Sequence, residues 1–207
     1  MGIKKDLTLT SPVILALGIL SAALSIFGDE ELFVAINQGM ANPVLDVLCA
    51  YGVPAVFAVY FTASLAALLL LGKENSRTVV RAGVAVALIS GPTSYSLGRA
   101  LKIVFGRPRP FETLPTRIVG PWHASPYSFP STTTMLAFGF ALPILFERPR
   151  LGAPLVVLAA LMGFSVVYTG FHYPSDVLAG TVLSILITVS MHRLKTPLTH
   201  LLARFNL

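Results

Sequence analysis

The sequence predicts an all-α, polytopic membrane protein with six transmembrane helices and an interfacial helix between the first two. The first observation is the composition: 55% of the 207 residues are hydrophobic and only 12% are charged, whereas a soluble domain carries about 25% charged residues. The second is the mean hydropathy of +0.78. The third is a series of six apolar runs of roughly the 17–25 residues that a helix needs to cross a bilayer.

The six runs define the predicted spans in order along the chain. They lie near residues 10–27, 54–72, 79–101, 131–146, 152–171 and 175–192. The first run has the alternative interpretation of a secretory signal peptide, because Lys4 and Lys5 precede it. No small-x-small cleavage site follows before the acidic residues 29–31, so we prefer a retained span. No internal repeat or low-complexity linker divides the chain, which indicates one membrane-embedded domain over residues 1–207.

The segment between the first two spans is "DEELFVAINQGMANPVLDVLCAYG", residues 29–52. It is moderately amphipathic, with apolar residues at helical spacing: Leu32, Phe33, Ile36, Met40 and Val44. This spacing predicts an interfacial helix that lies on the outer membrane surface. A plain connecting loop is the alternative.

The lysines and arginines predict the orientation of the chain in its membrane. An even number of spans places both termini on one side, together with ten of the 15 basic residues. The side that is richer in basic residues is expected to be cytoplasmic, so we expect an integral protein of a bacterial or archaeal plasma (inner) membrane with both termini in the cytoplasm. The other five face the outer, periplasmic side: Arg99, Lys102, Arg107, Arg109 and Arg117. Their concentration in one segment indicates an anionic ligand there.

The composition also excludes other classes of protein. A net charge of +6 and a pI near 9.8 are compatible with nucleic-acid binding, but the basic residues are dispersed between apolar runs and form no basic face interleaved with aromatic residues. No nucleic-acid partner is therefore expected. The single cysteine, Cys49, rules out a disulfide framework and a multi-cysteine metal site. The sequence leaves the oligomeric state open.

The stretch "KIVFGRPRP", residues 102–110, places three cations where the third predicted span leaves the bilayer. These are Lys102, Arg107 and Arg109, and the prolines that follow the two arginines stiffen the backbone around them. Closely placed guanidinium groups suit the several oxygens of a phosphate. The alternative, anchoring to lipid headgroups, requires basic residues but not the two Arg-Pro steps.

A hydroxyl-rich stretch, "PSTTT", opens the fourth predicted span. Ser131, Thr132 and Thr133 follow Pro130, and their hydroxyls add to the free N–H groups of a helix start, which together form a favourable anion site. Taken alone, ordinary capping of the helix explains this segment equally well.

The stretch "GFHYPSD" contains His172, which follows the fifth predicted span, and Asp176, four residues later in the first turn of the sixth. A carboxylate in a membrane span costs about 2.5–3.5 kcal/mol even on lenient scales, so it normally has a partner. A carboxylate bonded to one imidazole nitrogen leaves the other free as a base or nucleophile. A metal site would need further ligands nearby. The remaining alternative is a histidine at a loop end beside an aspartate that caps a helix.

Together these segments resemble the type 2 phosphatidic acid phosphatase superfamily, integral membrane lipid phosphatases that share a helical core with vanadium haloperoxidases. The residues that match the three family motifs are Lys102, Arg109 and Pro110 for the first, Pro130 and Ser131 for the second, and Ser165, His172 and Asp176 for the third. The order of the motifs and the spans extends the resemblance over residues from about 10 to 195.

The resemblance implies a phosphatase or phosphotransferase that acts on a lipid phosphate or an isoprenoid diphosphate at the outer leaflet. It makes His172 the nucleophile, which forms a phosphohistidine, and Asp176 the residue that orients it. Lys102, Arg109 and Ser131 then hold the phosphoryl oxygens. It implies no metal and no other cofactor.

Two positions depart from the family motifs. The second motif continues with glycine and histidine where this chain has Thr132 and Thr133, and the third has arginine where this chain has Val166. The missing histidine is the expected general acid, whose loss costs about 10²–10⁴ in rate. His123 is a possible substitute acid, because it lies in the loop that leads into the second motif. Arg107 could supply part of the missing charge.

These departures leave three interpretations open. The chain is an active enzyme whose substrate has a good leaving group, such as a diphosphate, or it is a catalytically dead relative that binds lipid phosphates or partners. The third interpretation is that Thr132, Thr133 and Val166 were introduced to silence turnover. A haloperoxidase is disfavoured by the membrane spans and the altered motifs. The sequence does not identify the lipid.

Overall fold

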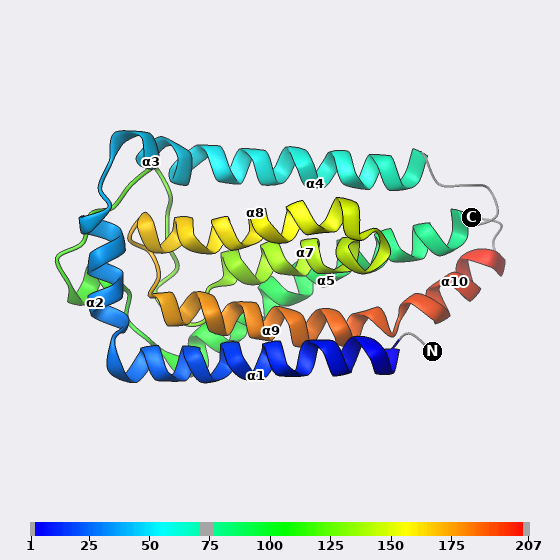
Figure 1. The fold of residues 1–207 in the computed structure, drawn as a ribbon, viewed down its shortest axis with the longest axis horizontal. Helices are drawn as coiled ribbons and strands as arrows, with labels where there is room; N and C mark the ends of the chain where they lie inside the picture. The colour runs from blue at the N-terminus through cyan, green and yellow to red at the C-terminus, as the bar shows by residue number, and fades with distance from the viewer. Residues whose placement is uncertain (1–2, 71–76, 205–207) are drawn as a thin grey trace.

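The computed structural model describes residues 3–70 and 77–204, and every regular element in these ranges is a helix (Figure 1). This confirms the all-α class. The long helices are α1 (Ile3–Phe27), α4 (Val53–Leu70), α5 (Arg77–Phe105), α7 (Thr132–Glu147), α8 (Pro149–Tyr168) and α9 (Pro174–His192). Within the described ranges, each of the six predicted spans lies on one of these helices, with boundaries that differ by a few residues.

Shorter helices connect the long ones or follow them. They are α2 (Asp29–Val34), a wider helical turn η1 (Ala35–Gly39), α3 (Pro43–Val47), a second wide turn η2 (Leu48–Gly52), α6 (Pro110–Thr113) and α10 (Lys195–Arg204). The α2–η1 segment is bent by 94° from α1 and crosses one end of the bundle (Figure 1). A helix therefore exists where the interfacial helix was expected, and its location at a membrane interface stays a prediction.

The helices support an integral membrane protein without establishing six spans. Within the described residues, three stretches are long and apolar enough to cross a bilayer: Pro43–Leu70, Pro149–Tyr168 and Pro174–His192. The bent pair α1 and α2–η1 adds a fourth if it is one span. Large apolar side chains also point outward, among them Phe27 at 82% and Leu70 at 79% exposure. Lipid is a more favourable environment than water for such a surface.

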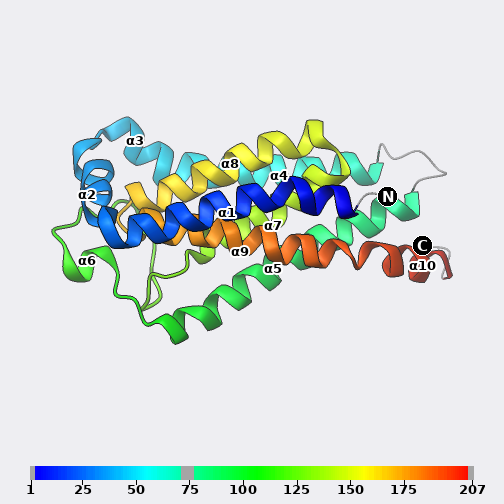
Figure 2. The same ribbon diagram turned by 60° about the horizontal axis from the view of Figure 1, so that its bottom comes forward.

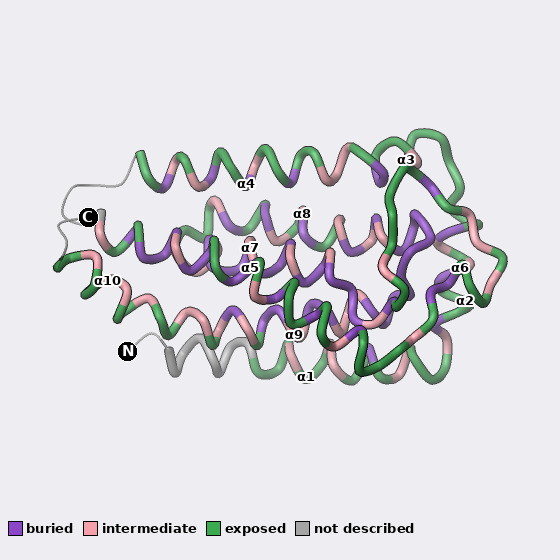
Figure 3. The backbone as a smooth tube through the Cα atoms, turned by 180° about the vertical axis from the view of Figure 1, so that it is seen from behind, coloured by how far each residue is buried: buried purple, intermediate pink, exposed green. Residues whose placement is uncertain are grey.

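Helix α7 lies at the centre of the bundle, packed against α5, α8 and α9. Figure 3 shows the contrast between the buried positions along α7 and the largely exposed α4. The backbones of α5 and α7 approach closely because small residues meet there: a Cβ added to Gly139 would lie 2.9 Å from the Cα of Gly91. Small residues at helix interfaces permit such close packing in membrane proteins.

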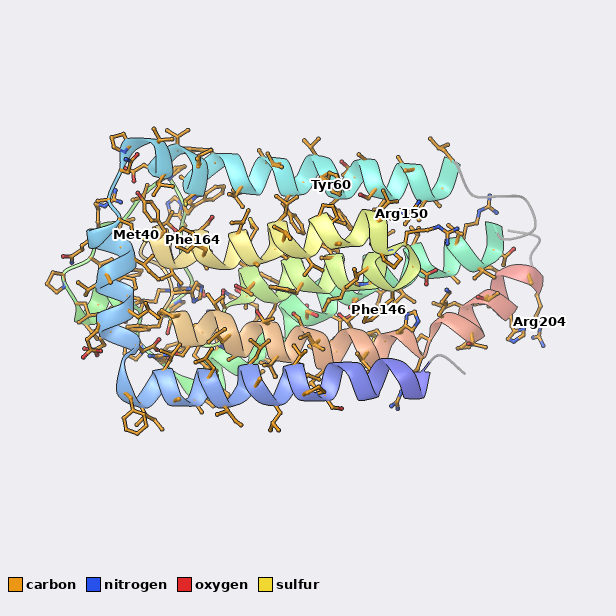
Figure 4. All side chains as sticks on the ribbon, in the orientation of Figure 1. Met40, Tyr60, Phe146, Arg150, Phe164 and Arg204 are labelled. Carbon is orange, nitrogen blue, oxygen red and sulfur yellow. The ribbon has the colours of Figure 1, made fainter. Side chains whose placement is uncertain are left out.

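The two ends of the bundle differ in their contents. One end carries the chain termini (Figure 1) and the labelled Arg150 and Arg204 (Figure 4). The opposite end carries α2, α3, α6 and the turn between α8 and α9, and Figure 2 shows the C-terminal part of α5 diverging from the other helices towards it. The end of α5, the start of α7 and the turn between α8 and α9, which hold the three polar segments singled out in the sequence, all lie towards this second end.

Candidate active site

A tight turn after α8 positions His172. Gly170 has a φ of +93°, a left-handed conformation that glycine adopts without steric cost. The chain then folds back, so that the backbone N–H groups of Phe171 and His172 both donate to the carbonyl of Val166, at 3.0 and 3.1 Å. The backbone of His172 is thus fixed before its side chain makes any contact.

Asp176 lies in the first turn of α9 and makes contacts in three directions. Its Oδ2 accepts a hydrogen bond from the backbone N–H of Tyr173 at 3.0 Å and lies 3.3 Å from Nδ1 of His172. Its Oδ1 accepts a hydrogen bond from Nη1 of Arg107 at 2.8 Å. Asp176 therefore caps the helix and holds the histidine at the same time, so the two interpretations that the sequence left open both apply.

The contacts of His172 determine which of its nitrogens is free. A carboxylate accepts only, so we assign the proton to Nδ1, beside Asp176, and the lone pair to Nε2. Nε2 lies 3.4 Å from Nη1 of Arg109. The side chain is buried, with 3% of the residue exposed, and this burial lowers the pKa of His172 to about 4 although the Asp176 carboxylate opposes the change. The imidazole is therefore neutral near pH 7 and carries a nucleophilic lone pair.

Arg109 is held rigidly beside this histidine. Its Nε donates to the carbonyl of Ser125 at 2.6 Å, and its Nη2 donates to the hydroxyl of the same residue at 3.1 Å. Its Nη1 donates to the carbonyl of Phe171 at 2.6 Å. Burial lowers the pKa of Arg109 to about 10, so the guanidinium is still charged near pH 7. A fixed cation next to His172 is suited to charge on phosphoryl oxygens.

Arg107 serves a different purpose, although only one residue separates it from Arg109. Its guanidinium donates to the carboxylates of Asp176 and Asp29 at 2.8 and 2.7 Å, and to the hydroxyl of Ser175 at 2.8 Å. Asp29 is 4% exposed and also accepts hydrogen bonds from the backbone N–H and the hydroxyl of Ser175. Arg107 does not line the cavity beside His172, and the structure gives it the role of fixing Asp176.

Two other residues that were predicted to hold phosphate are also engaged elsewhere. Nζ of Lys102 donates to the carbonyls of Tyr127 and Ser128 at 2.8 and 2.6 Å. The Oγ of Ser131 accepts hydrogen bonds from the backbone N–H and the hydroxyl of Thr134, at 3.4 and 2.9 Å, and so caps α7. Neither residue lines the cavity, and their contact with phosphate stays a prediction.

A cavity of about 380 Å³ opens beside His172. It is lined by Cys49 and Pro54, by Tyr95 and Arg99 of α5, by Arg109, by residues 122–125, by Thr132 and Thr133 of α7, by Met162, Ser165 and Val166 of α8, and by Thr169, Phe171 and His172. Two guanidinium groups and two imidazoles, of His123 and His172, belong to this lining. None of these lining residues is Asp or Glu, so an anionic ligand fits the charge of the cavity.

Besides Arg109, Ser165 and His172, the cavity brings together four further residues that the sequence analysis singled out, and it adds one. Thr132, Thr133, Val166 and His123 all lie in its wall. Arg99 was counted only as a basic residue of the outer side, yet it too lines the cavity. The signal that could have identified it is its position inside a predicted span, because ionisable residues in spans are usually functional. The described residues include no group of three or more His, Cys, Asp or Glu side chains placed to hold a metal ion.

The fold and the site together define a class: helical membrane proteins with a histidine–carboxylate pair and a fixed guanidinium beside a cation-lined cavity, an arrangement suited to phosphoryl transfer. The comparison with known families agrees. The PAP2 superfamily profile matches residues 78–199, and the chain belongs to this superfamily. The resemblance that the motifs indicated is thereby confirmed.

Individual relatives are similar over most of the chain. Undecaprenyl-diphosphatase BcrC of Bacillus subtilis is 32% identical over 161 residues, covering 77% of this chain and 80% of its own. Undecaprenyl-diphosphatase of Sulfolobus acidocaldarius is 30% identical over 180 residues, covering 80% and 81%. The crystal structure of Aquifex aeolicus LpxE superposes with a TM-score of 0.60 at 27% identity, covering 79% of this chain and 93% of its own. These relationships support a phosphoric ester hydrolase activity in a membrane protein.

Proposed function

We propose that this protein hydrolyses an isoprenoid diphosphate or another lipid phosphate through a phosphohistidine at His172. The observation that carries the proposal is the environment of that imidazole. Nδ1 lies 3.3 Å from the Asp176 carboxylate, and Nε2 lies 3.4 Å from the Arg109 guanidinium in the wall of the cavity. A neutral imidazole supplies the nucleophile, and the guanidinium stabilises the charge on the phosphoryl oxygens.

The reaction has two steps that share the same nitrogen. In the first, the lone pair of Nε2 of His172 forms a bond to phosphorus, and the bond from phosphorus to the leaving oxygen breaks with its electron pair going to that oxygen. In the second, a water molecule attacks phosphorus, the N–P bond breaks, and inorganic phosphate leaves while the water proton passes to the surrounding water. Asp176 keeps the proton on Nδ1, which stabilises the positive charge of the ring in the intermediate.

The relatives favour an isoprenoid diphosphate among the possible substrates. The two described above are named as undecaprenyl-diphosphatases. The apolar surfaces of the helices provide room for a lipid chain, but their residue pattern does not identify a particular lipid chain. The cation-lined cavity suits a head group with several negative charges.

In this proposal the protein has six spans, both termini lie in the cytoplasm and the cavity lies at the outer face. The orientation is supported by Arg150 and Arg204, which lie at the end of the bundle that carries the termini and opposite the cavity, because cytoplasmic segments are rich in basic residues. A fluorescent protein that matures only in the cytoplasm, fused after Leu207, is expected to fluoresce. A dark fusion in intact, well-expressed protein would contradict this orientation.

His123 is the candidate for the proton donor, because Thr133 stands where the family has its proton-donating histidine and cannot take that role. It lies in the loop between α6 and α7 and lines the same cavity as His172. Its conversion to glutamine is expected to slow the cleavage of lipid monophosphates, because an alkoxide leaving group needs a proton. An unchanged rate on a monophosphate would remove this assignment.

The test of the central proposal is phosphate release by detergent-purified protein. We would compare undecaprenyl diphosphate, phosphatidate and phosphatidylglycerophosphate, in the unaltered protein and in His172→Ala. Loss of a residue that forms the covalent bond is expected to lower kcat by at least about 10³-fold. His200→Ala is the matched control, because His200 is exposed on α10 at the opposite end of the bundle. Equal activity in both variants would sink the proposal.

A second candidate function is lipid-phosphate binding without turnover. It is favoured by Thr133 and Val166, which line the cavity where the family motifs carry a histidine and an arginine. A non-catalytic protein is expected to release no phosphate and to bind phosphatidate in a saturable manner. That binding should weaken in Arg109→Ala, which removes the fixed cation. Phosphate release that depends on His172 would exclude this candidate.

A further inference from the structure

Arg99 differs from the other arginines of the site because no described residue engages its guanidinium. Arg107 and Arg109 each donate several hydrogen bonds to protein oxygens. Arg99 is exposed and lines the cavity. Throughout the ranges 3–70 and 77–204, no hydrogen bond or ion pair engages its guanidinium. Its five N–H donors are therefore free for a ligand.

The position of Arg99 along α5 places it on the membrane side of the reacting histidine. α5 runs towards the end of the bundle that holds the site and ends at Phe105. Arg99 precedes this end by six residues, or about 9 Å at the usual helical rise. His172 lies beyond the ends of the long helices, in the turn between α8 and α9. A ligand whose lipid chain lies between the helices thus passes Arg99 before its head group reaches His172.

The two cavity cations therefore lie at two depths. Arg109 is next to Nε2 of His172, where a phosphorus atom must sit to be attacked. Arg99 lies deeper, on the path from the lipid chain to that phosphorus. Two phosphoryl groups in series, as in a diphosphate, match two cations in series, whereas a monophosphate leaves the deeper cation without an anion.

We propose that Arg99 binds the lipid-proximal phosphate of a diphosphate substrate and stabilises it as the leaving group. The inference rests on the proposed function and specifies its substrate class. In the first step, Nε2 of His172 bonds to the terminal phosphorus, and the bond from that phosphorus to the bridging oxygen breaks. The electron pair remains on the bridging oxygen, which departs as part of a lipid monophosphate anion paired with the Arg99 guanidinium.

This assignment accounts for the tolerance of threonine at position 133. A phosphate monoester loses its second proton near a pKa of about 6, so it leaves as an anion without being protonated. An alkoxide leaving group resembles hydroxide, whose conjugate acid has a far higher pKa, and it needs a proton donor. With a diphosphate substrate, the charge of Arg99 stabilises the leaving group, so no proton transfer is needed. With a monophosphate substrate, the leaving group is an alkoxide and still needs a proton.

Arg99 also compensates for Val166. The family motif carries an arginine at that position of α8, and this chain has none there. Val166 and Arg99 line the same cavity from α8 and α5. The cavity thus carries a guanidinium on α5 although position 166 carries none. The place of this guanidinium favours substrates with a second phosphate.

The test compares two substrates that differ by one phosphate, farnesyl diphosphate and farnesyl monophosphate, as kcat/KM for phosphate release. Arg99→Gln is expected to lower the value for the diphosphate by about 10²-fold, the lower end of the loss caused by removing one donor to a developing negative charge, and to change the monophosphate by less than about three-fold. Arg99→Lys should restore part of the loss, because it keeps the charge. Arg81→Gln is the matched control, since Arg81 lies on α5 at the opposite end. An equal loss on both substrates, or no loss on either, would overturn the proposal.

Failure of the proposed function itself gives a different pattern. If the unaltered protein releases phosphate from neither substrate, the enzyme assignment fails. The binding of the lipid-proximal phosphate by Arg99 is then tested separately, by measuring lipid affinity in His172→Ala. That variant is expected to bind farnesyl diphosphate at least about ten-fold more tightly than the monophosphate, and the added Arg99→Gln change is expected to abolish the preference. Equal affinity for the two lipids in His172→Ala would refute the role of Arg99.

Discussion

The cavity has two walls, and they differ in how many of their polar groups are hydrogen-bonded to other residues of the protein. The loop wall consists of Arg109, Phe171 and His172, and its side-chain and backbone groups are held by hydrogen bonds within the protein. The helix wall consists of Arg99, Thr133 and Val166. No residue in the described part of the chain engages the guanidinium of Arg99, and the other two side chains depart from the family motifs. The loop wall is arranged before any ligand arrives, whereas the helix wall is completed by the ligand.

This difference separates the two tasks of the site. A nucleophile must be fixed in advance, because its orientation decides whether attack occurs. A cation that receives a leaving group needs only to be unpaired and nearby at that moment. The loop wall therefore sets the type of reaction, and the helix wall sets the class of substrate.

The largest effect is expected from disturbing the loop wall at Asp176. Asp176→Asn keeps the size of the side chain but offers the wrong partner to Nδ1 of His172, and the analogous change in a catalytic triad lowers kcat by about 10⁴-fold. We expect a loss of about 10³–10⁴-fold in phosphate release. Asp46→Asn is the control, because Asp46 lies at the same end but binds Arg117. Similar losses in both variants would mean that charge at this end, not orientation of His172, controls the rate.

The support behind the loop wall can be broken at Asp29. Asp29→Asn removes one carboxylate from the buried group in which Arg107 bridges Asp29 and Asp176, and loss of one partner of a buried ion pair typically costs 3–5 kcal/mol. Because Arg107 is partly exposed, we expect about 3 kcal/mol. In Asp46→Asn the loss should be smaller, because the Asp46–Arg117 pair is more exposed. Thermal unfolding in one detergent compares the two, and equal shifts would argue against a structural role for Asp29.

The helix wall can be converted to the family pattern by Thr133→His together with Val166→Arg. The new imidazole supplies a general acid and the new guanidinium a second phosphate contact, so turnover of farnesyl monophosphate is expected to rise about ten-fold, below the full effect of a well-placed acid. The two single changes allow the coupling between the positions to be measured. A rise for the diphosphate alone would contradict the division of tasks between the walls.

The smallest effect concerns the titration of His172. Burial lowers its pKa to about 4, below the ordinary value of about 6.5, so the ring should stay neutral as the pH falls from 8 to 5. The unfolded chain takes up this proton near pH 6.5 and the folded chain only near pH 4, so the contribution to stability is present above pH 6.5 and is lost as the pH falls towards 4. Imidazole ¹⁵N shifts, assigned with His172→Ala, report the midpoint, and a value near 6.5 would contradict the buried environment.

The sequence was sufficient for the long helices and for the centre of the site. Apolar runs identify helices whatever their tertiary contacts, so within the described residues each of the six predicted ranges coincides with one helix to within a few residues, while residues 71–72 of the second range lie outside the described part. The pairing of His172 with Asp176 followed from their spacing of four residues and the cost of a lone carboxylate in a span. The terminal helix α10 was not predicted, because it is not marked by an apolar run of its own.

The remaining residues depend on three-dimensional contacts that spacing does not encode. Lys102, Arg107 and Arg109 lie within eight residues of each other, yet only Arg109 lines the cavity. The other two turn to partners that are distant in the sequence, such as Asp29 for Arg107 and Ser128 for Lys102. A cluster of cations in the sequence therefore predicts a positively charged region but does not say which cation faces the cavity.

The Asp176 carboxylate has two functions, and this affects what its presence in a related protein means. Because the same carboxylate begins α9 and holds the ring of His172, a descendant that abandoned catalysis would still be selected to keep it for folding. His172 has no such second duty in its side-chain contacts. A surviving aspartate at this position thus records the ancestry of the fold, whereas a surviving histidine records continued use of the chemistry.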